Sequence, residues 1–152
     1  MDNNNREGLP AITLDKRNGQ VTLHQTTLNA IGRPEYFRML LDDDNSVLLL
    51  ESCSHTDQGG IKIYYSNANN TDSDKRYERV YSRYMLRLLY TECGWLDDYS
   101  YRIYGTKVQG KPMVCFLIDR AEIVGKKYIQ GKYTEVYEIE TSEMDQLEYK
   151  NE

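Results

Sequence analysis

The sequence predicts a β-dominated α+β domain in which two β-β-α-β-β repeats form one barrel around a pseudo-twofold axis. Two segments, residues 11–52 and 61–119, contain the same order of expected elements: strand, strand, helix, strand, strand. Alternating apolar and polar residues, such as Ile12 and Leu14 in AITLD, are typical of half-buried strands. Turn residues separate these runs. Because one unit occurs twice, we expect the two copies to close a common core.

The first repeat begins with a hairpin. Asn18-Gly19 separates two alternating runs, and this dipeptide is a strong signal for a tight hairpin turn. A short helix follows, which Gly32 should end and which Pro34 prevents from continuing. The expected elements are strand 11–15, turn 16–19, strand 20–24, helix 25–32, strand 36–42, turn 43–45 and strand 46–52. Three consecutive leucines, 48–50, predict burial on both faces of the last strand or at the seam of a dimer.

The second repeat has a longer helix and a long inserted loop. Ser82 is a suitable N-cap residue for this helix, and Gly94 should end it. The expected elements are strand 61–65, polar loop 66–76, strand 77–81, helix 82–94, strand 99–105, turn 108–111 and strand 112–119.

The chain divides into three parts. Residues 1–9 are polar and asparagine-rich and are expected to form a disordered arm. Residues 10–124 should form the barrel domain, with a flexible linker at 53–60. Residues 125–152 form a C-terminal extension with no counterpart in the first repeat. It is interpreted either as a weak edge strand or hairpin over 134–140 with an acidic tail, or as a solvated acidic terminus throughout.

The predicted core combines the inward positions of the strands with one face of each helix. It comprises Ile12, Leu14, Val21, Leu23, Leu28, Ile31, Leu40, Leu48, Leu50, Met85, Leu88, Leu89, Trp95, Ile103, Val114, Phe116 and Ile118.

Charge is unevenly distributed along a mildly acidic chain of 152 residues with a net charge of −5. Residues 133–152 hold seven acids and one base, whereas residues 61–90 hold six bases and three acids. The overall charge argues against a protein that binds polyanions over its whole surface. The 14 tyrosines, against two phenylalanines and one tryptophan, suit half-exposed strands and also suit interfaces.

Cysteine content and hydropathy predict a cytoplasmic protein. The three cysteines form no C-x-x-C or metal-binding pattern, which favours a reducing compartment, and Cys93 and Cys115 are expected to be small core residues. The start MDNNNREGLP lacks the basic and apolar regions of a signal peptide, and no apolar run is long enough for a membrane span. We therefore expect no association with a membrane.

Catalysis is not indicated. The only imidazoles are His24, at the end of a strand, and His55, in the linker, and no nucleophile–base or nucleotide-binding motif is present. The acidic runs 42–44 and 97–98 admit cation ligation, but a solvated turn is the favoured interpretation because no calcium-loop pattern accompanies them. We expect a non-enzymatic protein with no catalytic residue, metal or cofactor.

The first repeat resembles the swapped-hairpin family of the AbrB, SpoVT and MazE type. The resemblance lies in a strand, a glycine turn continued by Gly19-Gln20-Val21-Thr22-Leu23, a short helix ending in Leu-Asn-Ala-Ile-Gly, and a hairpin with an acidic turn. Gln20 stands where the family usually has a base, and His24 stands where it has a proline. Two copies in one chain are similar to the arrangement of MraZ-type proteins. The resemblance implies a swapped-hairpin barrel and DNA binding.

By this resemblance, the bases of the first hairpin and of the second repeat would contact DNA. They are Lys16, Arg17, Lys75, Arg76, Arg79, Arg83 and Arg87. Lysine and arginine on one face suit phosphate contacts, and Arg83 and Arg87 share a helix face. The alternative is a solvated basic face balanced by nearby acids.

Two functions are therefore expected. The first is a small cytoplasmic transcriptional regulator or antitoxin-like protein that binds double-stranded DNA. The alternative is a non-enzymatic protein-interaction module, an adaptor or inhibitor, that keeps the fold without binding DNA and binds a protein partner through its tyrosine-rich strands or acidic tail. A homodimer is compatible with either.

Overall fold

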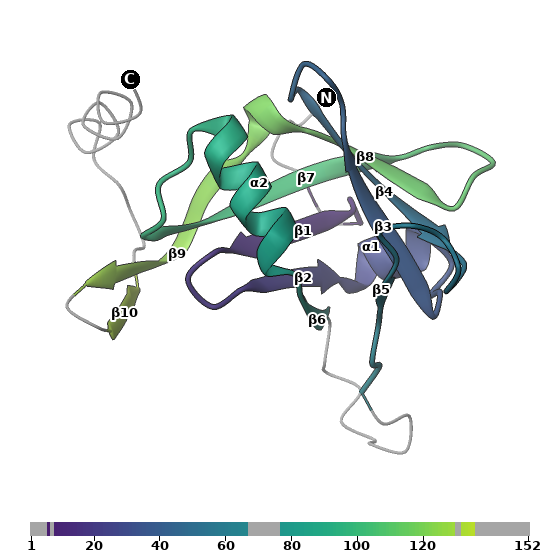
Figure 1. Ribbon diagram of the computed structural model, residues 1–152, viewed down its shortest axis with the longest axis horizontal. Helices are drawn as coiled ribbons and strands as arrows, with labels where there is room; N and C mark the ends of the chain where they lie inside the picture. Colours follow the sequence, from purple (N-terminus) through teal and green to yellow (C-terminus); the bar gives the residue numbers. More distant parts are fainter. Residues whose placement is uncertain (1–5, 7, 67–76, 130–131, 136–152) are drawn as a thin grey trace.

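The computed structural model describes residues 6, 8–66, 77–129 and 132–135, and its elements are shown in Figure 1. Strands dominate, and two α-helices and one short 3-10 helix accompany them in the described part of the chain. The strands are β1 Ala11–Asp15, β2 Gln20–His24, β3 Tyr36–Leu41, β4 Val47–Cys53, β5 Ile61–Lys62, β6 Tyr77–Tyr81, β7 Tyr99–Lys107, β8 Met113–Leu117, β9 Glu122–Ile129 and β10 Lys132–Glu135. The helices are α1 Gln25–Ala30, α2 Arg83–Cys93 and the 3-10 helix Ile118–Arg120.

One antiparallel sheet curls into a nearly closed barrel. Its strand order is β5-β3-β4-β8-β7-β1-β2-β6, and β9 and β10 branch from β7. The long strand β7 makes the branch possible, because Tyr101–Tyr104 pair with β1 on one side while Tyr99–Arg102 pair with β9 on the other. Residues 105–107 pair with β8. The architecture is thus β-dominated and compatible with the α+β class.

The local signals for both helices are confirmed. The side chain of Ser82 accepts a hydrogen bond from the backbone N–H of Met85 at 3.4 Å, and Gly94 ends α2 with a φ of 69°. Gly32 follows α1 with a φ of 84°. These left-handed conformations are what a helix-ending glycine supplies at little steric cost.

The core lies inside the barrel and beneath the two helices. Inward residues alternate along the strands, as the period-2 pattern predicts, and α1 and α2 contribute their apolar faces. The completely or almost completely buried apolar residues include Ile12, Leu14, Val21, Leu23, Leu28, Ile31, Phe37, Leu48, Leu50, Leu86, Leu89, Ile103, Val114 and Phe116.

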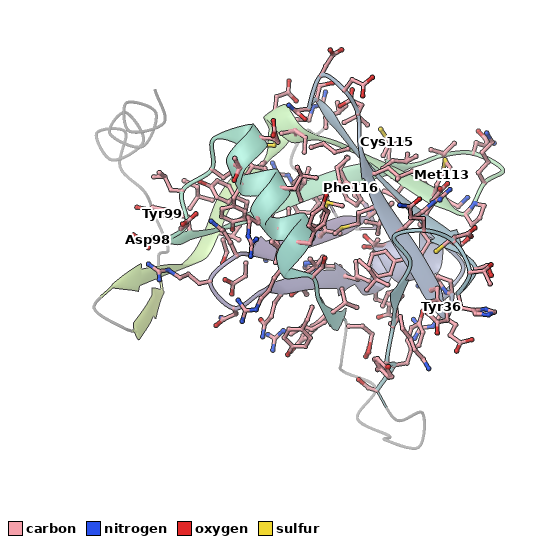
Figure 2. The ribbon with its side chains drawn as sticks, in the orientation of Figure 1. Tyr36, Asp98, Tyr99, Met113, Cys115 and Phe116 are labelled. Atoms are coloured by element: carbon pink, nitrogen blue, oxygen red, sulfur yellow. The ribbon has the colours of Figure 1, made fainter. Side chains whose placement is uncertain are left out.

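Leu40 is the clearest error in the predicted core, since its side chain is 42% exposed. In β3 the buried positions are Phe37 and Met39, so Leu40 must face outward. Its neighbours across the sheet are Leu49 and then Cys115, which also lie on the outer face and are only half-buried. The expected core position of Cys115 is therefore wrong as well. Figure 2 labels Cys115 beside Phe116, which is completely buried.

The second helix is rotated from the expected orientation. Leu86, Leu89 and Tyr90 form its buried face, whereas the predicted core residues Met85 and Leu88 are only partly buried. Tyr90 takes this place because its ring packs edge-on against two aromatic rings, with centroids 5.4 Å from Trp95 and 5.5 Å from Tyr101.

The later strands depart from expectation in length and position. The expected strand 61–65 is paired only at Ile61–Lys62, and an unpredicted strand, β9, runs beside β7 and pairs with β10. Most of the expected strand 134–140 and the acidic tail lie outside the described residues. None of the helices in the described part of the chain combines the length and the apolar character that crossing a membrane requires.

Candidate nucleic-acid interface

The outer face of β7, β1, β2 and β6 carries a straight row of four polar side chains. Arg102 pairs with Thr13, Thr13 with Thr22, and Thr22 with Arg79 in the strand registers. The alternating neighbours Ile12, Leu14, Val21, Leu23, Val80 and Ile103 are buried, so these four side chains point away from the core. Beyond Arg102 the register continues to Glu122 on β9, whose carboxylate forms an ion pair with Arg6.

A shallow pocket of about 250 Å³ lies over this row. Its walls include both arginines and both threonines, together with Gln20, His24 and Asp15. The carboxylate of Asp15 accepts hydrogen bonds from the backbone N–H and side-chain amide of Asn18, at 3.2 Å and 2.9 Å, and so braces the β1–β2 turn. Most of the residues that line the pocket carry a side-chain group that can donate a hydrogen bond.

Three of the pocket residues form a hydrogen-bonded chain. Nε of Arg102 donates to Oγ1 of Thr13 at 3.3 Å, and Oγ1 of Thr13 lies 3.0 Å from Nε2 of His24. Burial, with a smaller contribution from the positive charge of Arg102, lowers the pKa of His24 below its usual value of 6.5. The ring is therefore mostly neutral at pH 7, and Nε2 can accept a hydrogen bond from the hydroxyl of Thr13.

The opposite end of the row is more exposed. Arg79 is exposed on β6, and its guanidinium carbon lies 4.9 Å from the centre of the Tyr77 ring. Such a contact orients the guanidinium over an aromatic face without neutralising its charge.

The predicted bases of the first hairpin are paired with acids. Nζ of Lys16 lies 2.8 Å from a carboxylate oxygen of Asp97, and Nη2 of Arg17 lies 2.8 Å from one of Asp98. Residues 97–98 lie in a turn, as expected, and their side chains remain 58% and 47% exposed while they pair with the two bases of the β1–β2 turn. Figure 2 labels Asp98 next to Tyr99, at the start of β7.

The predicted helix bases remain exposed. Arg83 and Arg87 lie on the outer side of α2, and Arg83 packs against the β1–β2 turn. The backbone N–H of Ser82 donates to the carbonyl oxygen of Gly19 at 3.1 Å, which fixes the start of α2 beside the turn. A Cβ at Gly19 would lie 3.1 Å from Cγ of Arg83, so the glycine provides the space for this contact. Lys75 and Arg76 lie outside the described residues.

Sequence reasoning missed Arg102, Thr13 and Thr22. Alternation in YSYRIY already indicated that Arg102 points away from the core. Its neighbour Thr13 is 89 residues away, however, and only the pairing of β7 with β1 brings them together.

The run Asp42–Asp44 forms a turn. The carboxylate of Asp42 accepts hydrogen bonds from the backbone N–H of Val47 at 2.9 Å and from the hydroxyl and backbone N–H of Ser46 at 2.8 Å and 2.7 Å, and these bonds lower its pKa. Within the described residues, no three histidine, cysteine or acidic side chains come together in a way that could hold a metal ion.

Comparison with known protein-family models, curated proteins and solved structures found no match.

Proposed function

We propose that this protein is a small DNA-binding regulator or antitoxin-like protein that contacts duplex phosphates through Arg79, Arg83 and Arg87, the arginine surface. One observation carries the proposal. These three side chains are exposed over β6 and α2, and no carboxylate among the described residues forms an ion pair with any of them. Phosphate contacts require lysine or arginine side chains that can displace the cations condensed on DNA.

Two of the other predicted bases adjoin this surface. Lys16 and Arg17 lie in the turn against which Arg83 packs, and they would strengthen binding once DNA competes with Asp97 and Asp98 for them. Lys75 and Arg76, which directly precede β6 in the chain, lie outside the described residues and stay a prediction from the resemblance.

The strand order supports the proposed repeat. If each strand of residues 11–52 is exchanged for its counterpart in 61–119, β1 becomes β5, β2 becomes β6, β3 becomes β7 and β4 becomes β8. The observed pairs β4–β8 and β2–β6 then map onto themselves, β1–β7 maps onto β5–β3, and β3–β4 maps onto β7–β8. A pseudo-twofold axis passing between β2 and β6 would produce this order.

The pairing of β1 with β2 in the first repeat has no equivalent in the second, because β5 and β6 do not pair within the described residues. β1 pairs with β2, whereas β5 and β6 are joined through side chains: the backbone N–H and the hydroxyl of Ser66, beyond β5, donate to the buried carboxylate of Glu78 on β6. A swapped-hairpin barrel of the AbrB, SpoVT and MazE type, made from two repeats of one chain, accounts for the interleaved order. DNA binding would follow from that relationship.

Binding of duplex DNA by fluorescence polarisation tests this function. The double variant R83Q/R87Q should weaken binding and reduce the slope of log K against log salt by about 0.9 for each phosphate that the variant no longer neutralises. K107Q/K111Q is the matched control, since it removes the same charge at the β7–β8 turn, which Figure 1 shows at the opposite end of the barrel from the β1–β2 turn. Absence of binding at micromolar protein and low salt would reject the proposal.

The second candidate is the non-enzymatic protein-interaction module, with a second copy of the chain as its first partner. The outer face of β3, β4 and β8 favours it, because Leu40, Leu49, Cys115 and Leu117 form an apolar patch there, with Leu40 42% and Leu117 36% exposed. Contiguous exposed apolar surface often marks an interface.

The mass of the particle in solution, measured by light scattering across a range of concentrations, tests this candidate. Wild type should form dimers that the variant L40E/L117K prevents, while R83Q/R87Q should leave them intact. A wild-type chain that stays monomeric at high micromolar concentration would exclude this interface.

A further inference from the structure

We propose that the pocket between Arg79 and Arg102 is a specific site for one phosphate group, held by the two guanidinium groups and the hydroxyl of Thr22. This site deepens the proposed function. Only the identification of the phosphate as part of DNA rests on that function. A phosphodiester of DNA and a free phosphate offer the same oxyanion, and the experiments below distinguish the two.

The spacing of the row suits a small ligand. Adjacent strands lie about 4.8 Å apart, so the backbones of Arg102 and Arg79, separated by three such intervals, are about 14 Å apart. Two long side chains extending toward each other across this distance can approach a common centre. Arg102 already leans over the row, since its Nε reaches Oγ1 of Thr13 on the neighbouring strand.

The donor set is what a phosphate requires. Each guanidinium offers a planar fork of N–H donors, which matches two oxygens of a phosphate. Thr22 contributes a hydroxyl between them, and Gln20, beside it in the pocket, contributes a side-chain amide. A tetrahedral oxyanion could therefore be bound from several directions by side chains of β7, β1, β2 and β6.

The charge of the pocket supports an anionic ligand. Arg102 is half-buried, yet no carboxylate among the described residues forms an ion pair with it or with Arg79. Two carboxylates lie nearby: Asp15 lines the pocket and accepts two hydrogen bonds from Asn18, and Glu122 pairs in register with Arg102 but forms its ion pair with Arg6. Purely structural arginines on a sheet face would be expected to pair with acids, as Arg38 does with Glu51 at 2.6 Å on β3 and β4.

One histidine reports binding in the pocket, and the other serves as an internal control. His24 lines the pocket, whereas His55 lies in the segment after β4, 6.1 Å from the ring of Tyr36. Titration of wild-type protein with inorganic phosphate at constant ionic strength should shift the ring signals of His24 along a saturable curve and leave those of His55 unchanged. Equal or non-saturating shifts of both histidines, or the same shifts with chloride, would overturn the proposal.

Variants distinguish phosphate binding in the pocket from a general effect of positive charge on the protein. R102Q should weaken phosphate binding at least tenfold, and so should R79Q, whose exposed side chain can be replaced without disturbing the core. K107Q/K111Q removes two charges elsewhere and should leave phosphate binding unchanged. Retention of wild-type phosphate affinity in both R79Q and R102Q would also overturn the site.

DNA binding by R102Q identifies the source of the phosphate. A fall in DNA affinity in R102Q, parallel to the fall in phosphate affinity, would place a DNA phosphodiester in the pocket. Unchanged DNA affinity with weakened phosphate binding would assign the pocket to a free phosphate compound. If wild-type protein binds phosphate but no DNA, the proposed function fails while the pocket stands.

Discussion

The hydroxyl of Tyr90, near the end of α2, lies 2.6 Å from the carbonyl oxygen of Tyr99 at the start of β7. The same hydroxyl lies 3.0 Å from the carbonyl oxygen of Leu14, and the backbone N–H of Lys16 points to it at 3.4 Å. One buried side chain thus connects the second helix to β1, to the β1–β2 turn and to β7. It fixes α2, and with it Arg83 and Arg87, beside the first hairpin.

Replacement of Tyr90 by phenylalanine should therefore destabilise the whole protein. The ring would still pack, but buried backbone groups would lose their partner, at a cost of about 1–3 kcal/mol. Chemical denaturation measures the change. Tyr84→Phe, on the same helix but 75% exposed, is the control and should change stability little. Equal stabilities of the two variants would contradict this role of the hydroxyl.

Thr27 makes a similar connection on the first helix. Its completely buried hydroxyl donates to the carbonyl oxygen of Ala11 at 2.7 Å and accepts from the backbone N–H of the same residue at 2.8 Å. Thr27→Val preserves the shape but leaves both groups of Ala11 unpaired, so we expect a cost of about 1–3 kcal/mol for each. Thr26→Val, a half-buried neighbour, controls for helix propensity. A destabilisation no greater than that of the control would refute the prediction.

Gly105 is the point at which β7 passes from β1 to β8. A Cβ at this position would lie 2.6 Å from Cδ1 of Phe116 and 2.8 Å from the carbonyl oxygen of Cys115. Gly105→Ala should therefore overpack the core and destabilise the fold by about 1–3 kcal/mol. The melting temperature should fall in this variant and change little in Thr106→Ala, where the side chain is exposed.

Stability should depend on pH through His24. Because burial lowers the pKa of His24 in the folded protein, the unfolded chain binds more protons between that pKa and the unfolded value of 6.5. The contribution is fully present above pH 6.5 and is lost as the pH falls toward the folded pKa. Unfolding free energies measured from pH 8 to pH 5 should decline less steeply in His24→Gln. Parallel curves for the two proteins would exclude His24 as a cause.

Removal of the acids that pair with the bases of the first hairpin should strengthen DNA binding. Asp97→Asn and Asp98→Asn remove the partners of Lys16 and Arg17, which become available to phosphates. The double variant should bind duplex DNA more tightly, and the salt dependence should become steeper by up to about 0.9 for each additional phosphate neutralised. Asp43→Asn/Asp44→Asn, at the exposed turn between β3 and β4, gives the same change in net charge. If both double variants bind DNA equally, only net charge matters.

The sequence by itself determined the local features of this protein. The Asn18-Gly19 turn, the Ser82 cap, and the glycines that follow the helices depend on residues only a few positions apart, and all were found where expected. Alternation identified the buried faces of most strands. It failed at Leu40, because the run Met-Leu-Leu is apolar at both odd and even positions and so does not define which side faces inward.

Tertiary structure alone decided which strands became neighbours. The pairing of β7 with β1 brings Arg102 to Thr13, and the residues just before the same strand supply the acids that neutralise Lys16 and Arg17. Many strands of similar composition could pair with β1, and the choice depends on the burial of the complete set of apolar side chains. Since that burial is a property of the whole barrel, no short segment of sequence contains it, and the polar row and its pocket emerge only when the barrel closes.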